Sequence, residues 1–153
     1  MKAVLMDGFG GVEVLKVGEA PRPVPADGQV LVKVYATTIN RPDLVQREGK
    51  YPPPAGDSEI LGLEVAGVIE ELGPGVTGWQ VGQRVMSLVG GGGYAEYAVA
   101  YASHLMPIPE SMTFEEAACV CESYITAFLN IFIIGEFKDG QTAILHGGGG
   151  GVN

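Results

Sequence analysis

Short segments in which apolar and polar residues alternate, separated by glycine and proline, fill the first 110 residues of this chain. Residues 29–40 alternate in this way and are rich in β-branched side chains, and residues 63–72 form a second long segment. Shorter strands are expected at residues 1–7, 85–88 and 94–100. Many short strands with such turns are typical of a barrel or a partly open sandwich. Gly67, inside a strand pattern, indicates a bulge or a tight bend.

The pattern becomes helical after Ser111. Thr113 and Glu116 have the spacing of a capping box, in which each side chain accepts a hydrogen bond from a free backbone amide of the first helical turn. The apolar stretch that follows is interrupted at residues 122–123, which predicts two short helices, the second ending at Gly135. Residues 141–146 then indicate a buried strand that leads into a run of glycines.

The composition excludes several functional classes. The chain has 153 residues, with 9 Lys and Arg against 18 Asp and Glu and a formal net charge of −9. This acidic balance argues against nucleic acid or an anionic membrane as a partner. With 46% hydrophobic and 18% charged residues, the chain is not generally disordered. No apolar run reaches the length of a membrane span, and no signal peptide opens the chain.

Two cysteines, Cys119 and Cys121, lie in an apolar run and make no disulfide framework. We expect both to be buried, reduced thiols in a cytoplasmic protein. Because they fall in a helical stretch, their side chains point in different directions, and we do not interpret them as a metal site.

The glycine run at residues 147–151 carries the first chemical signal. A strand that runs into a glycine-rich turn is how a dinucleotide-binding βαβ unit begins, because glycines let the backbone approach a pyrophosphate. Gly148 and Gly151 are the best placed for this contact. The helix and the acidic ribose partner that would confirm it are not in the chain, so a flexible glycine-rich tail is the alternative hypothesis.

A series of motifs follows one order from residue 40 to the end of the chain. They are Asn40-Arg-Pro-Asp-Leu44, Gly49-Lys-Tyr51, the segment from Gly62 through Glu64 and Gly67 to Gly75, Gly91 to Tyr97, Glu122 to Ala127, and His146 to Val152. Together they resemble the zinc-independent quinone oxidoreductases of the medium-chain dehydrogenase/reductase superfamily. Residues 40–46 and 122–127 resemble most closely the p53-inducible quinone oxidoreductase subgroup.

The resemblance implies a mainly β fold with some α. A GroES-like, partly open β-barrel domain would occupy residues 1–121, and residues 122–153 would be a linking helix with the first strand and glycine-rich loop of a truncated Rossmann domain. Two such domains take roughly twice this length, so we expect the chain to be part of a longer oxidoreductase that forms a homodimer. The alternative is an isolated barrel domain, folded but inactive, or an interaction module.

The implied reaction is zinc-independent hydride transfer from NADPH to a quinone or related enone. A quinone is electron-poor, so hydride can attack it directly when the nicotinamide is held close. Zinc-dependent relatives hold the metal with a Cys, a His and a further Cys. Here Asn40 stands in place of the first Cys, Leu63 replaces the His, and Glu122 stands near the last Cys.

The resemblance also assigns roles to single residues. Asn40, Tyr51 and Asp43 would form the catalytic group, with Tyr51 at the mouth of the substrate pocket and Asp43 orienting the Asn40 loop. The cofactor would be bound by Asn40, Thr126, Gly148 and Gly151.

Simpler roles compete with these. Asp43 suits the capping of a helix that Pro42 begins, and Tyr51 suits a surface turn. We expect Glu64 to be an ion-pair partner inside the barrel domain rather than a catalytic group. Asn153 departs from the family, which has glycine there for close packing of helix and strand.

Overall fold

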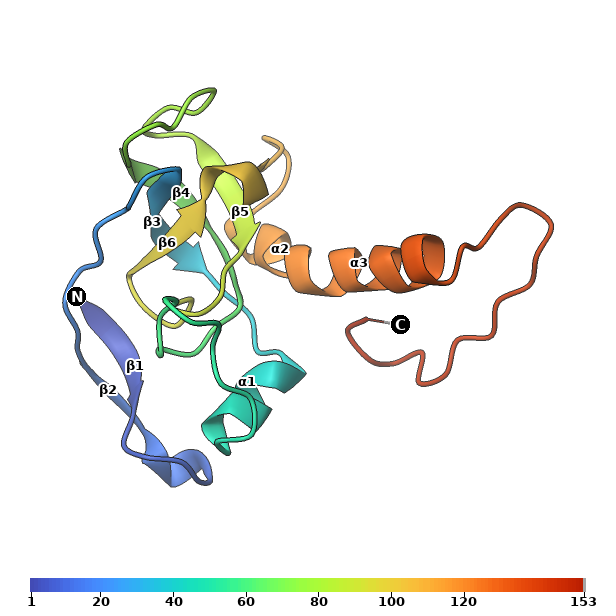
Figure 1. Ribbon diagram of the computed structural model, residues 1–153, viewed down its shortest axis with the longest axis horizontal. Helices are drawn as coiled ribbons and strands as arrows, with labels where there is room; N and C mark the ends of the chain where they lie inside the picture. Colours follow the sequence, from blue (N-terminus) through green and yellow to red (C-terminus); the bar gives the residue numbers. More distant parts are fainter. Residues whose placement is uncertain (153) are drawn as a thin grey trace.

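Two antiparallel sheets form the β-rich part of the protein, whose residues 1–152 are described by a computed structural model (Figure 1). The strands are β1 (Lys2–Met6), β2 (Leu15–Glu19), β3 (Gln29–Ala36), β4 (Glu64–Leu72), β5 (Arg84–Leu88), β6 (Tyr97–Tyr101) and β7 (Met106–Pro107). The α-helices are α1 (Arg41–Arg47), α2 (Phe114–Ala118) and α3 (Cys121–Phe128). Two 3₁₀ turns, η1 (Val12–Val14) and η2 (Ala102–His104), and a π-helical segment, η3 (Leu129–Ile134), complete the helical elements.

The larger sheet has the strand order β6-β3-β4-β5-β7, and β1 and β2 form a separate two-stranded sheet. An isolated bridge joins Ala3 of β1 to Ala95, two residues before β6 begins. The core lies within the curve of the larger sheet, where Val30, Val32 and Ile69 have no solvent exposure. The sheets do not close, which confirms the predicted partly open, mainly β architecture.

The bulge expected near Gly67 is present. Gly67 pairs with Val34, and the next pair along the strands is Ala66 with Ala36, so Tyr35 is the extra residue of β3. A Cβ atom on Gly67 would lie 2.1 Å from the backbone oxygen of Lys33, closer than real Cβ atoms approach. Glycine is therefore required here, because the backbones of β3 and β4 come too close for any side chain.

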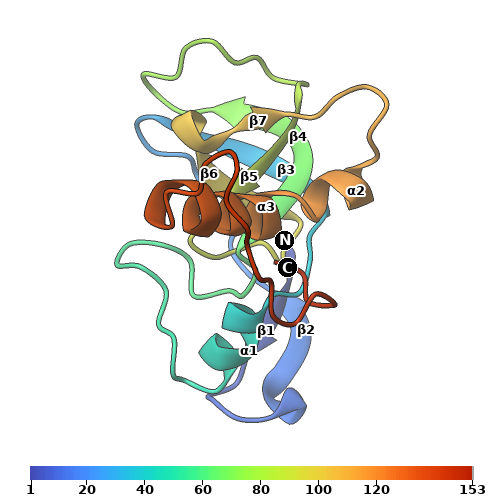
Figure 2. The same cartoon turned by 90° about the vertical axis from the view of Figure 1, so that its right-hand side faces the viewer.

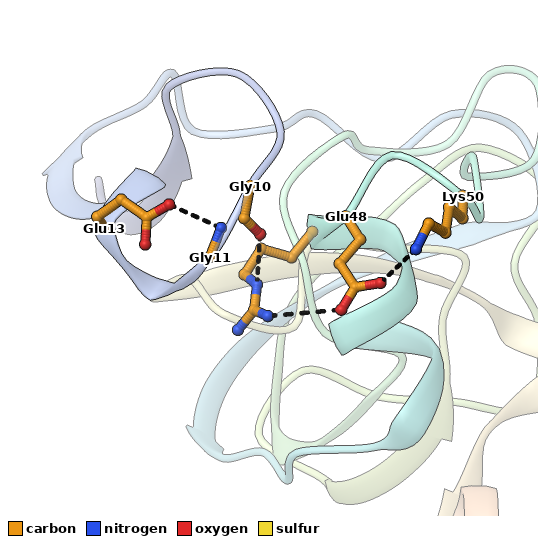
Figure 3. Close-up of polar contacts among 6 residues, drawn as sticks. Gly10, Gly11, Glu13, Glu48 and Lys50 are labelled. Atoms are coloured by element: carbon orange, nitrogen blue, oxygen red, sulfur yellow. Dashed lines mark hydrogen bonds and ion pairs between the residues drawn. The ribbon is translucent and has the colours of Figure 1, made fainter.

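Helix α1 is attached to the hairpin of β1 and β2 at its carboxyl end (Figures 2 and 3). The Arg47 guanidinium donates to the Gly10 carbonyl at 3.0 Å, and the Gly10 amide donates to the Arg47 carbonyl at 3.1 Å. Glu48 follows the helix and pairs with Lys50 at 3.0 Å. These bonds fix the far end of the helix whose first residues belong to the candidate site.

The predicted helical segment begins with the expected capping box. Thr113 Oγ1 accepts from the Glu116 amide at 3.2 Å, and the Glu116 carboxylate accepts from the Thr113 amide at 2.8 Å. Helix α2 buries Ala117 and Ala118 against Ala66 and neighbouring residues of the sheet. Helix α3 and η3 then project away from the sheet and end at Gly135, as predicted (Figure 1).

The buried strand expected at residues 141–146 is wrong. These residues are described, yet they form no strand, and Ile144 and Leu145 are 80% and 60% exposed. An extended segment becomes a strand only when neighbouring strands accept its backbone hydrogen bonds, and no described strand lies alongside it. The prediction concerning Asn153 lies outside the described residues. No helix in the described part of the chain is long and apolar enough to cross a membrane.

The close approach at Gly67 predicts a large effect of a small substitution. We expect Gly67→Ala to lower the free energy of unfolding by about 1–3 kcal/mol, because β3 and β4 must move apart. Gly149→Ala is the matched control, since open space surrounds Gly149 and it should change stability by less than about 0.5 kcal/mol. Urea unfolding followed by circular dichroism measures both. Equal stability of the two variants would contradict the assigned approach of the strands.

Candidate active site

A buried carboxylate, Asp43, fixes the loop that enters α1. It is 2% exposed and occupies the third position of the helix. Its Oδ2 atom accepts from the Asn40 backbone amide at 2.7 Å and from the Tyr94 hydroxyl at 2.9 Å. Its Oδ1 atom accepts from the Gly62 amide at 3.2 Å. Asp43 therefore caps the helix, and the same bonds fix the backbone of Asn40 relative to two distant loops.

Tyr94 and Gly62 form the far side of this contact. Burial, followed by the negative charge of Asp43, raises the pKa of the Tyr94 hydroxyl above its ordinary value of 10. Gly62 has a φ of +103°, and a Cβ there would lie 2.7 Å from the Gly93 Cα. The Gly62 amide reaches Asp43 because only glycine takes this conformation in this space.

A second buried carboxylate, Glu64, begins β4 and lies opposite the end of β3. Because Ala36 pairs with Ala66, Glu64 faces the residues that follow β3 in the chain. Its Oε1 atom accepts from the Thr38 hydroxyl and, at 2.8 Å, from the side-chain nitrogen Nδ2 of Asn40. Its Oε2 atom accepts from the backbone amide of Glu122 at 2.9 Å.

These contacts correct the expectation that Glu64 is an ion-pair partner. Glu64 is 1% exposed, and the partners that the structure gives it are a hydroxyl, a side-chain amide and a backbone amide. A buried carboxylate is stabilised by several N–H and O–H donors in place of a cation. The physical reason is that the loop after β3 and the first turn of α3 both direct hydrogen-bond donors at Glu64.

The start of α3 combines burial with the negative charge of nearby carboxylates. Burial, with added repulsion from Glu64 and Glu122, raises the pKa of the Cys121 thiol to about 12. Burial also raises the pKa of the Glu122 side chain, and the charges of Glu64 and Asp43 add to this effect. Cys121 is buried as expected, but Cys119 is exposed, which corrects the prediction for that thiol. Cys119 lies on the solvent side of the turn between α2 and α3, two residues before Cys121.

The structure brings some of the predicted site residues together. Asn40, Asp43 and the first turn of α3 are connected through the two carboxylates. Thr126 is half-buried one helical turn after Glu122 and so shares a face of α3 with it. A Cβ on Gly151 would lie 3.4 Å from Ser123 Oγ, which places the glycine run beside the same helix.

Tyr51 and Gly148 are not part of this group. Tyr51 is 46% exposed and follows the carboxyl end of α1, and Gly148 has open space around it. Sequence reasoning missed the contributions of Thr38 and Tyr94. Thr38 precedes Asn40 by two residues, a local signal that was available, whereas Tyr94 lies 51 residues after Asp43 and no spacing connects them.

No group of three or more His, Cys, Asp or Glu side chains among residues 1–152 is placed to hold a metal ion. Of the two residues that the resemblance compared with zinc ligands, Asn40 donates its side-chain amide to Glu64, and Leu63 carries an aliphatic side chain. Neither side chain is a thiolate or imidazole, the ligand types that zinc selects.

The sequence profile of the alcohol dehydrogenase GroES-like domain matches residues 26–110. The mouse protein named quinone oxidoreductase is 37% identical over 155 residues, which cover 99% of this chain and 46% of that protein. The crystal structure of the human synaptic vesicle membrane protein VAT-1 homolog-like protein superposes with a TM-score of 0.91, at 34% identity, over 99% of this chain and 49% of that chain.

A mycobacterial protein solved in complex with NADPH has a TM-score of 0.89 and 36% identity, over 99% of this chain and 47% of that chain. The chain therefore spans about half the length, or less, of the proteins that it matches.

The buried hydroxyl of Tyr94 predicts a pH dependence of stability. The folded state keeps this proton above pH 10, where the unfolded state loses it, so folding becomes less favourable as the pH rises through that range. We expect the wild type to exceed Tyr94→Phe in stability at pH 8 and this advantage to shrink by pH 11. Urea unfolding of both proteins at the two pH values measures the difference. A constant difference would mean that Tyr94 titrates alike in both states.

The unequal burial of the two cysteines predicts selective labelling. In the folded protein, we expect an aromatic disulfide reagent at pH 8 to modify Cys119 and to spare Cys121, which is 1% exposed and has a raised pKa. Both thiols should react in urea, and Cys119→Ser should abolish the fast reaction of the folded protein. Fast labelling of the Cys119→Ser variant under native conditions would contradict the burial of Cys121.

Proposed function

The chain belongs to the family of the alcohol dehydrogenase GroES-like domain, within the medium-chain dehydrogenase/reductase superfamily, and on this premise we propose a function for it. The chain supplies the substrate-facing part of a zinc-independent reductase that uses NADPH to reduce a quinone or a related enone. The observation that carries the proposal is the pair of buried carboxylates that holds Asn40 against the first turn of α3. The relatives named quinone oxidoreductase and the relative bound to NADPH support the reaction class.

The residues present fit the nicotinamide end of such a cofactor. Asn40 is immobilised because its backbone amide donates to Asp43 and its side-chain amide donates to Glu64. Glu64 also accepts from Glu122 of α3, and Thr126 lies one turn further along that helix. A Cβ on Gly148 would meet no atom within 4 Å, and Gly151 lies beside Ser123. When bound, NADPH supplies the hydride, and these side chains bind and orient the ring. Immobilised groups of this kind lower the entropy cost of a reactive geometry.

The proposed chemistry is zinc-free, and the side chains of Asn40 and Leu63 support this. The Asn40 nitrogen and the Leu63 side chain occupy the positions at which metal ligands would be needed, and neither binds zinc well. Reduction of a quinone needs a hydrogen-bond donor for the oxygen on which charge develops. We assign this contact to the hydroxyl of Tyr51, a residue that is 46% exposed, or to water. Homodimerisation of the whole protein and a cytoplasmic location stay predictions.

The proposal predicts the behaviour of a form of the protein that also carries a complete nucleotide-binding domain. We expect it to oxidise NADPH in the presence of 1,4-benzoquinone, and Asn40→Ala to lower kcat/KM about tenfold or more, the value of one hydrogen bond of about 1.4 kcal/mol. Gln80→Ala, which changes an exposed amide in the turn between β4 and β5, is the control. Stopped-flow absorbance at 340 nm follows the oxidation.

The same assay distinguishes this reductase from an interaction module. A protein that contains both domains but oxidises NADPH with no quinone or enone would refute the proposed function. Full turnover by residues 1–153 alone would refute the assignment of cofactor binding to a second domain.

A further inference from the structure

The hydrogen bonds around Glu64 determine which way the Asn40 amide faces. Both Glu64 oxygens accept from N–H donors, Nδ2 of Asn40 on one and the Glu122 backbone on the other, which is the pattern of an ionised carboxylate. Such a group only accepts, so the Thr38 hydroxyl must donate its one proton to Glu64. The Thr38 oxygen is then left as an acceptor.

The remaining contact of Thr38 completes the assignment. Nδ2 of Asn40 lies 3.2 Å from Thr38 Oγ1 and 2.8 Å from Glu64 Oε1, so both of its hydrogens have acceptors inside the protein. The other polar atom of the amide, Oδ1, lies at the first turn of α1 near the Asp43 backbone amide, which donates to the Asn40 backbone carbonyl at 3.1 Å. A carbonyl oxygen has two lone pairs, so it can accept a hydrogen bond from a ligand as well.

We infer that Glu64 is a positioning residue that commits Asn40 to accept, through Oδ1, a hydrogen bond from a hydroxyl or amide donor of the nicotinamide nucleoside. Asn40 does not donate to the oxygen of the quinone. The inference rests on the proposed function, because it names the contact that Asn40 makes in that site. It also assigns Glu64 a second task, because its other oxygen anchors the amide of Glu122 at the start of α3.

Exchanging the carboxylate of Glu64 and the amide of Asn40 tests which of the two groups donates and which accepts. In Glu64→Gln, one end of the side chain becomes an NH₂ group that faces either the Glu122 amide or the Asn40 NH₂. Where it faces the Asn40 NH₂, the Asn40 amide is expected to turn and to present its NH₂ to the ligand. In Asn40→Asp, a carboxylate faces the Glu64 carboxylate at the distance of a hydrogen bond, which is repulsive. The double variant Asn40→Asp with Glu64→Gln restores one donor facing one acceptor and leaves a carboxylate oxygen toward the ligand.

The first experiment measures the orientation in the 153-residue chain and needs no cofactor. The ¹⁵N-labelled side-chain amide of Asn40 should exchange its hydrogens with water slowly, because both are bonded inside the protein. Glu64→Gln should speed this exchange about tenfold, and Thr38→Val should speed it by a smaller factor. Thr38→Val also serves if Glu64→Gln fails to fold. Fast exchange in the wild type would overturn the inferred orientation.

The second experiment measures the role, in a form that also carries a complete nucleotide-binding domain. The dissociation constant of NADPH, from nicotinamide fluorescence, should rise about tenfold in each single variant and return to within about threefold of the wild type in the double variant. Glu70→Gln, which changes an exposed glutamate of the same strand that pairs with Arg22, should leave binding unchanged. A thermal unfolding midpoint for every variant separates loss of folding from loss of binding.

The outcomes of the two experiments are distinct. A double variant as weak as Asn40→Asp alone would mean that Asn40 donates to its ligand, and would overturn the inference while the proposed function stands. A wild-type protein that does not bind NADPH would refute the proposed function and, with it, the ligand role of Asn40.

Discussion

Two buried carboxylates without cations hold the candidate site together. In the described part of the chain, neither Asp43 nor Glu64 forms a salt bridge, and each accepts hydrogen bonds from three donors. The donors to Asp43 come from three segments, and those to Glu64 come from the loop after β3 and the start of α3. Transferring a carboxylate from water into the protein interior costs free energy unless several hydrogen-bond donors replace the water. The donors are therefore obligatory, and the loop after β3, the Gly62 turn, Tyr94 and the start of α3 must meet where the carboxylates lie.

The fold makes this meeting possible through the close contact of β3 and β4. Gly67 lets the two backbones approach, and the bulge at Tyr35 sets the register in which Glu64 faces the loop that contains Thr38 and Asn40. Helix α2 packs on the same sheet, and the Glu122 amide in the first turn of the following helix, α3, donates to the second oxygen of Glu64. The close packing of β3 and β4 thus determines the orientation of the Asn40 side-chain amide.

Most of the elements were predictable from the sequence, because strand alternation, the Thr113 capping box and Gly67 are local signals. Asp43 as a helix cap was predictable for the same reason. The partners of Glu64 were not, since Glu122 lies 58 residues away and a buried glutamate more often suggests a cation. The strand expected at residues 141–146 failed for a related reason. Its apolar residues carry strand propensity, but a strand also needs neighbours, which the segment does not itself contain.

The charge of the site bears on what it would reduce. Burial and then the charges of Glu64 and Asp43 raise the pKa of Glu122, and burial and then the charges of Glu64 and Glu122 raise the pKa of the Cys121 thiol. No described salt bridge neutralises Asp43, Glu64 or Glu122 in this group. An anionic substrate would be repelled here, whereas a neutral quinone or enone would not. Under the proposed function, the same field would oppose the negative oxygen that hydride addition creates, and a proton that arrives with the hydride would remove this repulsion. Burial at the start of α3, followed by the charges of Glu64 and Asp43, raises the pKa of Glu122, so its carboxylate is a stronger proton acceptor than that of an exposed glutamate.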